Sequence, residues 1–109
     1  MLGEFEYVLI TTAAGLGEDA YGVAIREEIE AAIQRKCSMG VLYTTMDRLE
    51  EKGLLKTWVG EATPQRGGRG KRMVRLTRQG ELAAKEFYDA VLRVSRGASW
   101  VETRTGRAS

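Results

Sequence analysis

A block of positive charge between residues 64 and 78 is the part of this sequence best suited to bind a charged partner. Glycines at positions 67, 68 and 70 lie within it and would let the backbone approach that partner closely. Cations at this density either displace counterions from phosphates or stay solvated on a loop, and the block alone leaves both interpretations open. Its six bases, with no acid among them, are Arg66, Arg69, Lys71, Arg72, Arg75 and Arg78.

Residues 38–55 form a second candidate site, because their pattern predicts a helix with an unusual outer face. Ser38 can cap this helix and Gly53 can end it. Leu42, Met46 and Leu49 recur at the helical period and predict a buried face. The first half of the opposite face is small or hydroxyl-bearing and almost uncharged, which favours close approach by a partner. The candidate contact residues there are Ser38, Met39, Gly40, Tyr43, Thr44 and Arg48.

Enzymatic chemistry has little support in this sequence. There is no histidine to act as a base or metal ligand, and a single cysteine, Cys37, cannot build a zinc site or an intrachain disulfide. The RGGRG run lacks the GxxxxGK[ST] spacing of a phosphate-cradling loop. We therefore expect no catalytic residues, no cofactor and no metal.

The location expected from the sequence is the cytoplasm. No apolar run is long enough to cross a bilayer, and the N-terminus lacks the basic start of a secretory signal. The lone cysteine fits a reducing compartment. We therefore expect a cytoplasmic protein with no membrane partner.

The 109 residues predict a single domain that begins with two more helices. The first spans residues 2–16 and ends at Gly17, and the second spans about 21–36 with Asp19 as its cap. A short link joins the second helix to the helix of residues 38–55, which predicts a helix-turn-helix. The second helix is expected to bury Tyr21, Ile25, Ile29 and Ala32.

Two short runs of strand-forming residues, 54–59 and 73–76, follow the third helix and flank the basic, glycine-rich loop. Strand, loop and strand after a helix-turn-helix predict a wing, and hence a mainly α fold with a small β-hairpin, the winged helix-turn-helix. Beside such a unit, the cations of the loop are favoured to contact DNA. Arg69 lies between glycines and is the candidate for a minor groove. The wing cations are Arg66, Arg69, Lys71 and Arg72.

A last helix, residues 78 to about 97, is predicted to begin at Thr77 and to carry a wide apolar stripe. A stripe without a partner in its own chain favours a homodimer. We expect residues 1–77 to form the winged unit, 78–101 a dimerisation helix and 102–109 a disordered tail. The predicted dimer interface comprises Leu2, Phe5, Ala84, Phe87, Tyr88, Val91, Leu92, Val94 and Ala98.

Four segments resemble the PadR family of bacterial transcriptional regulators, from residue 2 to about residue 88. They are LGEFEYVLI, GEDAYGVAIREEIE, LYTTMDRLEEKGLL, and TPQRGGRGKR followed by VRLTRQG. The resemblance implies a winged-helix, dimeric repressor that binds a double-stranded DNA operator, in the compact branch with a single helix after the wing. It also allows a small aromatic or hydrophobic effector between the subunits, near Tyr88, Val91 and Trp100, where plain dimer packing is the alternative.

A second function stays open at this point. A winged helix can serve as a protein–protein interaction module without DNA binding, with a solvated basic loop and a last helix that binds a different chain.

Overall fold

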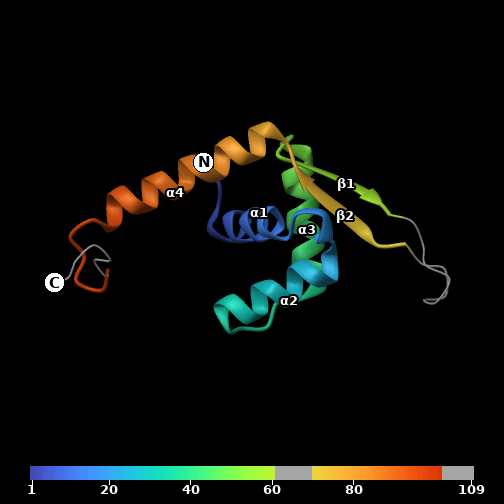
Figure 1. The fold of residues 1–109 in the computed structure, drawn as a ribbon, viewed down its shortest axis with the longest axis horizontal. Helices are drawn as coiled ribbons and strands as arrows, with labels where there is room; N and C mark the ends of the chain where they lie inside the picture. The colour runs from blue at the N-terminus through green and yellow to red at the C-terminus, as the bar shows by residue number, and fades with distance from the viewer. Residues whose placement is uncertain (61–69, 102–109) are drawn as a thin grey trace.

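A computed structural model describes residues 1–60 and 70–101 and shows a winged-helix fold (Figure 1). Three helices are followed by a two-stranded antiparallel hairpin and a fourth helix, as the sequence predicted. Arg66, Arg69 and the predicted tail lie outside the described residues. The elements are α1 (Glu4–Leu16), the 3-10 turn η1 (Gly17–Asp19), α2 (Gly22–Ile33), α3 (Met39–Glu51), β1 (Leu55–Val59), β2 (Arg72–Leu76) and α4 (Arg78–Ser95).

The core lies between α1, α2 and α3 and is closed by the hairpin. Leu42, Met46 and Leu49 on α3 are fully buried, which confirms the inner face predicted from their spacing. Ile25 and Ile29 meet them from α2 and are also fully buried. These side chains fix the helix-turn-helix, because a close-packed interior tolerates little rotation or sliding of one helix on another.

The prediction for α2 was wrong at both ends. The helix ends at Ile33 because Gln34 takes a left-handed conformation, with φ of 58°. Its start is not capped by Asp19, which belongs to the 3-10 turn η1, and Tyr21 occupies the N-cap position without a side-chain hydrogen bond. Ala32, predicted to face inward, is exposed.

The hairpin is anchored to the helices through β2. Leu55 pairs with Leu76 and Thr57 with Val74 in the antiparallel register. Val74 is buried, and its backbone N–H donates to the carbonyl of Ala20 at 3.0 Å. This bond holds β2 beside the start of α2, so the hairpin and the helix-turn-helix form one body.

Helix α4 begins as predicted, with Thr77 as its N-cap. The Thr77 hydroxyl accepts from the Gly80 N–H at 3.0 Å and donates to the Gly53 carbonyl at 2.7 Å. The part of α4 up to Phe87 then packs on α1, where the rings of Phe87 and Tyr7 stack at 4.6 Å between centroids. The second half projects away from the three-helix body (Figure 1).

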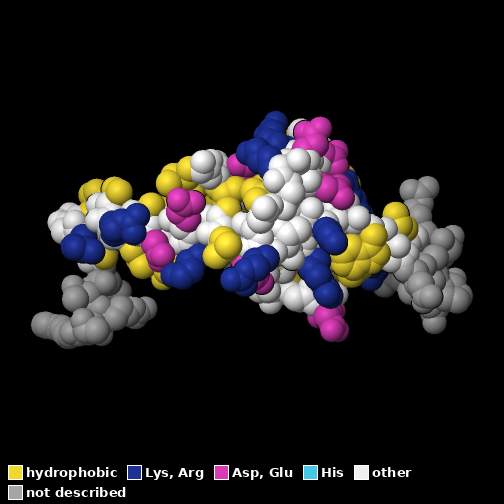
Figure 2. Space-filling view, turned by 90° about the horizontal axis from the view of Figure 1, so that it is seen from above, with side chains coloured by type: hydrophobic (Ala, Val, Ile, Leu, Met, Phe, Trp, Pro, Cys, Tyr) yellow, Lys and Arg dark blue, Asp and Glu magenta, His cyan; other side chains and the backbone are white. Residues whose placement is uncertain are grey.

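These contacts divide the residues predicted at the dimer interface into two groups. Leu2 is 7% exposed in the single chain, and Ala84 and Phe87 pack against the same core. The expectation that α4 has no partner within its own chain is wrong for the part up to Phe87, because α1 covers that part. The outer half carries exposed apolar side chains, visible along the projecting helix in Figure 2. They include Tyr88, Val91, Leu92 and Val94.

Glu6 is an acidic residue in an otherwise apolar position. It is 7% exposed, and its carboxylate accepts from the Gly3 N–H and from Lys52 Nζ, both at 2.8 Å. The backbone donor and, after it, the Lys52 ammonium lower the pKa of Glu6. The ion pair joins the first turn of α1 to the end of α3, and the helical period could not have identified it.

The close approach of α4 to the α3–β1 link predicts that Gly80→Ala destabilises the fold. A Cβ at Gly80 would collide with the carbonyl of Leu54 and press on Ile10. Overpacking of this kind costs about 1–3 kcal/mol, measurable as a lower midpoint of urea unfolding. Gly15→Ala on α1 is the control, because nothing lies within 4 Å of its Cβ position and a gain of roughly 0.5 kcal/mol is expected. Equal effects of the two substitutions would contradict the packing at Gly80.

The Glu6 ion pair predicts a pH-dependent contribution to stability. Because folding lowers the pKa of Glu6, its contribution is complete above the unfolded pKa of roughly 4.3 and disappears as the pH falls through the lower folded value. We expect Glu6→Gln to lower the free energy of unfolding by about 1 kcal/mol at pH 7 and to have little effect at pH 3. Glu4→Gln, an exposed acid in the same turn, is the control. A pH-independent effect of Glu6→Gln would exclude the ionised carboxylate as the cause.

Candidate nucleic-acid interface

The outer face of α3 presents small and polar side chains at its N-terminal end. Ser38 caps the helix, and its hydroxyl accepts from the Val41 N–H at 3.0 Å. Gly40, Thr44 and Arg48 are exposed on this face. Met39 is half-buried and packs against the core, so it offers less of its side chain than predicted.

Val41 is a further exposed residue on α3, and it is not among the contact residues predicted from the sequence. Its side chain is 56% exposed, and it shares a face with Thr44 and Arg48, three and seven residues further along the helix. The signal in the sequence was an apolar residue at a helical position that does not belong to the buried face of α3. In a major groove, such a group can contact the methyl group of thymine.

Tyr43 joins α3 to the start of α2. It is half-buried, and Gly22 packs so closely on its ring that a Cβ at Gly22 would lie 2.7 Å from the Tyr43 hydroxyl oxygen. The two helices can approach this closely because Gly22 has no side chain. The ring therefore supports the packing of the helix-turn-helix and still has a partly exposed side.

A hollow of about 280 Å³ opens between the start of α2, α3 and the residues at the start of β2. Lys71 is one of its lining residues, and the Lys71 Nζ lies 4.2 Å from the centroid of the Tyr21 ring. The first N–H groups of α2 have no side-chain cap and lie at the same place. An ammonium group beside a helix N-terminus favours an anion such as phosphate. We call this the α2–β2 hollow, and its lining residues are Tyr21, Gly22, Val23, Tyr43, Gly70, Lys71 and Arg72.

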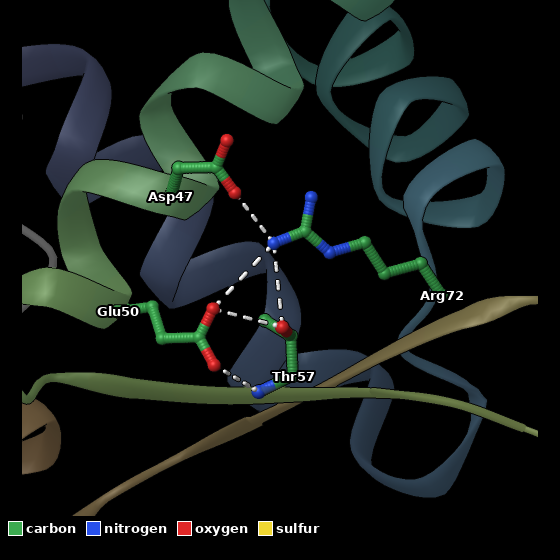
Figure 3. A network of polar contacts seen from close by, with 4 residues as sticks. All are labelled: Asp47, Glu50, Thr57 and Arg72. Atoms are coloured by element: carbon green, nitrogen blue, oxygen red, sulfur yellow. Dashed lines mark hydrogen bonds and ion pairs between the residues drawn. The ribbon is translucent and has the colours of Figure 1, made fainter.

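Arg72 is held by acidic residues of α3 (Figure 3), although its place in the sequence grouped it with the wing cations expected to contact DNA. Its Nη2 donates to Asp47 Oδ1 at 2.6 Å and to Thr57 Oγ1 at 3.3 Å, and lies 3.6 Å from Glu50 Oε1. Its guanidinium carbon is also 5.6 Å from the Tyr43 ring centroid. Asp47 and Arg72 are 25 residues apart in the chain, so no local pattern could have paired them.

The residues predicted to line an effector cavity do not enclose one in a single chain. Tyr88 and Val91 are 51% and 44% exposed on the outer half of α4, and Trp100 is 83% exposed beyond its end. A cavity among them would need a second subunit to close it.

Three further observations bear on functions other than nucleic-acid binding. Burial raises the pKa of the Cys37 thiol, with a further contribution from Glu30, which disfavours the reactive thiolate. Within residues 1–60 and 70–101, no three or more acidic or cysteine side chains gather to hold a metal ion. No helix in the described part of the chain is both long enough and apolar enough to span a membrane.

Comparison with protein families matches residues 13–86 to the transcriptional regulator PadR-like family. No curated protein matches the chain.

Similar solved structures include a PadR-like transcription factor from Bacteroides fragilis, 24% identical with a TM-score of 0.69, covering 84% of this chain and 82% of that one. A PadR family regulator from Eggerthella lenta is 23% identical with a TM-score of 0.66, covering 86% and 81%. F93 from STIV, a winged-helix DNA-binding protein, is 22% identical with a TM-score of 0.68, covering 89% and 97%. At these identities the structures establish the winged-helix fold alone.

Proposed function

Because the chain belongs to the PadR-like family of transcriptional regulators, we propose that it is a homodimeric, cytoplasmic repressor that binds a specific double-stranded DNA operator. The observation that carries this proposal is the α2–β2 hollow beside the outer face of α3. There a cation, Lys71, and the uncapped start of α2 adjoin a helix face whose first half lacks acids.

The first half of α3 would read base edges in the major groove. Gly40 lets the helix approach the bases, Thr44 can donate or accept a hydrogen bond, and Arg48 can donate two hydrogen bonds to a guanine. Val41 adds an apolar contact suited to a thymine methyl group. All four side-chain positions are exposed in the free protein, so DNA can reach them without rearrangement of the helix.

The α2–β2 hollow would receive a backbone phosphate. The Lys71 ammonium supplies the charge, and the N–H groups at the start of α2 supply oriented donors. The Tyr43 hydroxyl can add a third donor. Because phosphates occur in every sequence, these contacts would set affinity and register and leave base preference to α3.

The outer half of α4 would form the dimer contact. Val91, Leu92 and Val94 are exposed apolar residues that a second copy can cover, with Tyr88 and Ala98 beside them. A twofold dimer fits a near-palindromic operator with half-sites about 34–36 Å apart. A small hydrophobic effector seated between the subunits, near Trp100, would act by favouring a dimer whose α3 helices no longer match that spacing.

The same exposed stripe favours a second candidate, a protein–protein interaction module. In that case the outer half of α4 would bind a different chain, and the chain would be a monomer by sizing chromatography without affinity for DNA.

The experiment that tests the repressor proposal is fluorescence anisotropy with the duplex upstream of the chain's own gene and a scrambled duplex. We expect the specific duplex to bind at least about a thousandfold more tightly near 150 mM salt, with affinity falling steeply as salt rises. If neither duplex binds even at low salt, the repressor proposal is wrong and the interaction module takes its place.

Lys71→Gln is expected to weaken binding to every duplex and to reduce the slope of log affinity against log salt by about 1 per subunit. The reason is the loss of one phosphate-neutralising charge at the hollow. Lys85→Gln makes the same charge change on exposed α4, away from the hairpin, and should leave the slope unchanged. An unchanged slope for Lys71→Gln would contradict the binding of a phosphate in the hollow.

Val91→Glu is expected to convert the dimer to a monomer at micromolar concentration, because a charge would have to be buried in an apolar contact. Analytical ultracentrifugation measures the change. Leu82→Glu is the matched control: Leu82 is 54% exposed on the same helix, but nine residues at 100° each place it on the opposite side from Val91. Dimer loss in both variants, or in neither, would refute this interface.

A further inference from the structure

We propose that Arg72 is a positioning residue that fixes the hairpin against α3, and that Asp47 and Glu50 hold it there in place of a DNA phosphate. The inference rests on the proposed function, because it assigns separate roles to two neighbouring cations of the same DNA-binding face. Lys71 would contact the phosphate, and Arg72 would set the angle at which the hairpin meets α3.

The contacts of Arg72 join three elements at one guanidinium group (Figure 3). From β2, its Nη2 reaches Asp47 on α3 at 2.6 Å and Thr57 on β1 at 3.3 Å. Glu50, one helical turn after Asp47, accepts from the Thr57 N–H at 3.3 Å and from its hydroxyl at 3.0 Å. Both strands of the hairpin are therefore attached to the same side of α3.

The surroundings of Arg72 disfavour a phosphate as its partner. The Arg72 side chain is 27% exposed and lies within 4 Å of two carboxylates. To bind DNA, it would have to leave Asp47 and Glu50 as unneutralised charges near a polyanion. Keeping the network leaves one net negative charge in place of two and preserves the hairpin geometry, which favours the positioning role.

The side chains of Lys71 and Arg72 point in different directions because they are consecutive residues at the point where β2 begins. Successive residues of an extended chain point to opposite faces. Lys71 is exposed and lies over Tyr21 at the α2–β2 hollow, whereas Arg72 points to α3 and β1. Both residues line the α2–β2 hollow, but the charged groups have different partners: the Lys71 ammonium lies over the Tyr21 ring, and Arg72 Nη2 contacts Asp47 and Thr57.

The first test needs no DNA. Asp47→Ala removes the shortest contact of Arg72, and Glu51→Ala removes an acid from the same exposed face of α3 that makes no ion pair within the described residues. Backbone order parameters from ¹⁵N relaxation should fall at residues 56–59 and 72–75 in Asp47→Ala and stay unchanged in Glu51→Ala. The melting temperatures of both variants should stay close to that of the unmodified chain. Unchanged order parameters in Asp47→Ala would overturn the proposal.

The second test uses the sign of the effect on DNA affinity. Simple electrostatics predicts that removing either acid tightens binding to a polyanion. Positioning predicts that Asp47→Ala weakens binding about fivefold with an unchanged salt slope, while Glu51→Ala binds as tightly as the unmodified chain or more tightly. If Asp47→Ala also binds more tightly, Arg72 is a phosphate ligand released by the substitution, and the proposal is wrong.

Arg72→Lys separates charge from geometry. A phosphate ligand would keep most of its affinity as lysine. A lysine ammonium lies one bond nearer the backbone than Arg72 Nη2, the atom that contacts both Asp47 and Thr57, so it would not reach them in the same position. We expect Arg72→Lys to match the loss seen in Asp47→Ala, and full affinity would contradict positioning. If the unmodified chain bound no duplex, the proposed function would fail, while the relaxation measurement would still decide whether the network orients the hairpin.

Discussion

The burial of one side of α3 is the constraint on which the rest of the structure depends. Leu42, Met46 and Leu49 are fully buried, so the rotation of this helix about its axis is fixed. A shift of one residue would turn the helix by about 100° and bring a different set of side chains to the surface. Thr44 and Arg48 are therefore presented outward by the packing of residues on the opposite side.

Local patterns predicted the winged helix because its elements are set by short-range rules. Ser38 and Thr77 cap their helices as expected, since a hydroxyl at that position satisfies a free backbone N–H regardless of the rest of the fold. The end of α2 at Ile33 was not predictable in the same way. Gln34 has no strong preference for a left-handed conformation, and the surrounding structure imposes it.

The outcome for α4 shows what a hydrophobic period can and cannot indicate. The stripe predicted a face that avoids water, and the structure covers only the part of it that packs on α1. Phe87 stacks on Tyr7 of the same chain, while Val91, one turn further, is exposed. Where the body of the domain ends along a projecting helix depends on the three-dimensional packing, which the spacing of apolar residues does not contain.

The pattern of charge indicated the candidate site, but the different contacts of its cations could be seen only in the structure. In the basic block of residues 64–78, the sequence pattern does not distinguish Lys71 from Arg72. In the fold, Lys71 adjoins the start of a helix, where an anion is favoured, and Arg72 adjoins Asp47, where its charge is already neutralised. A count of basic residues therefore overestimates the phosphates that this surface can neutralise, because part of the positive charge maintains the geometry that places the rest.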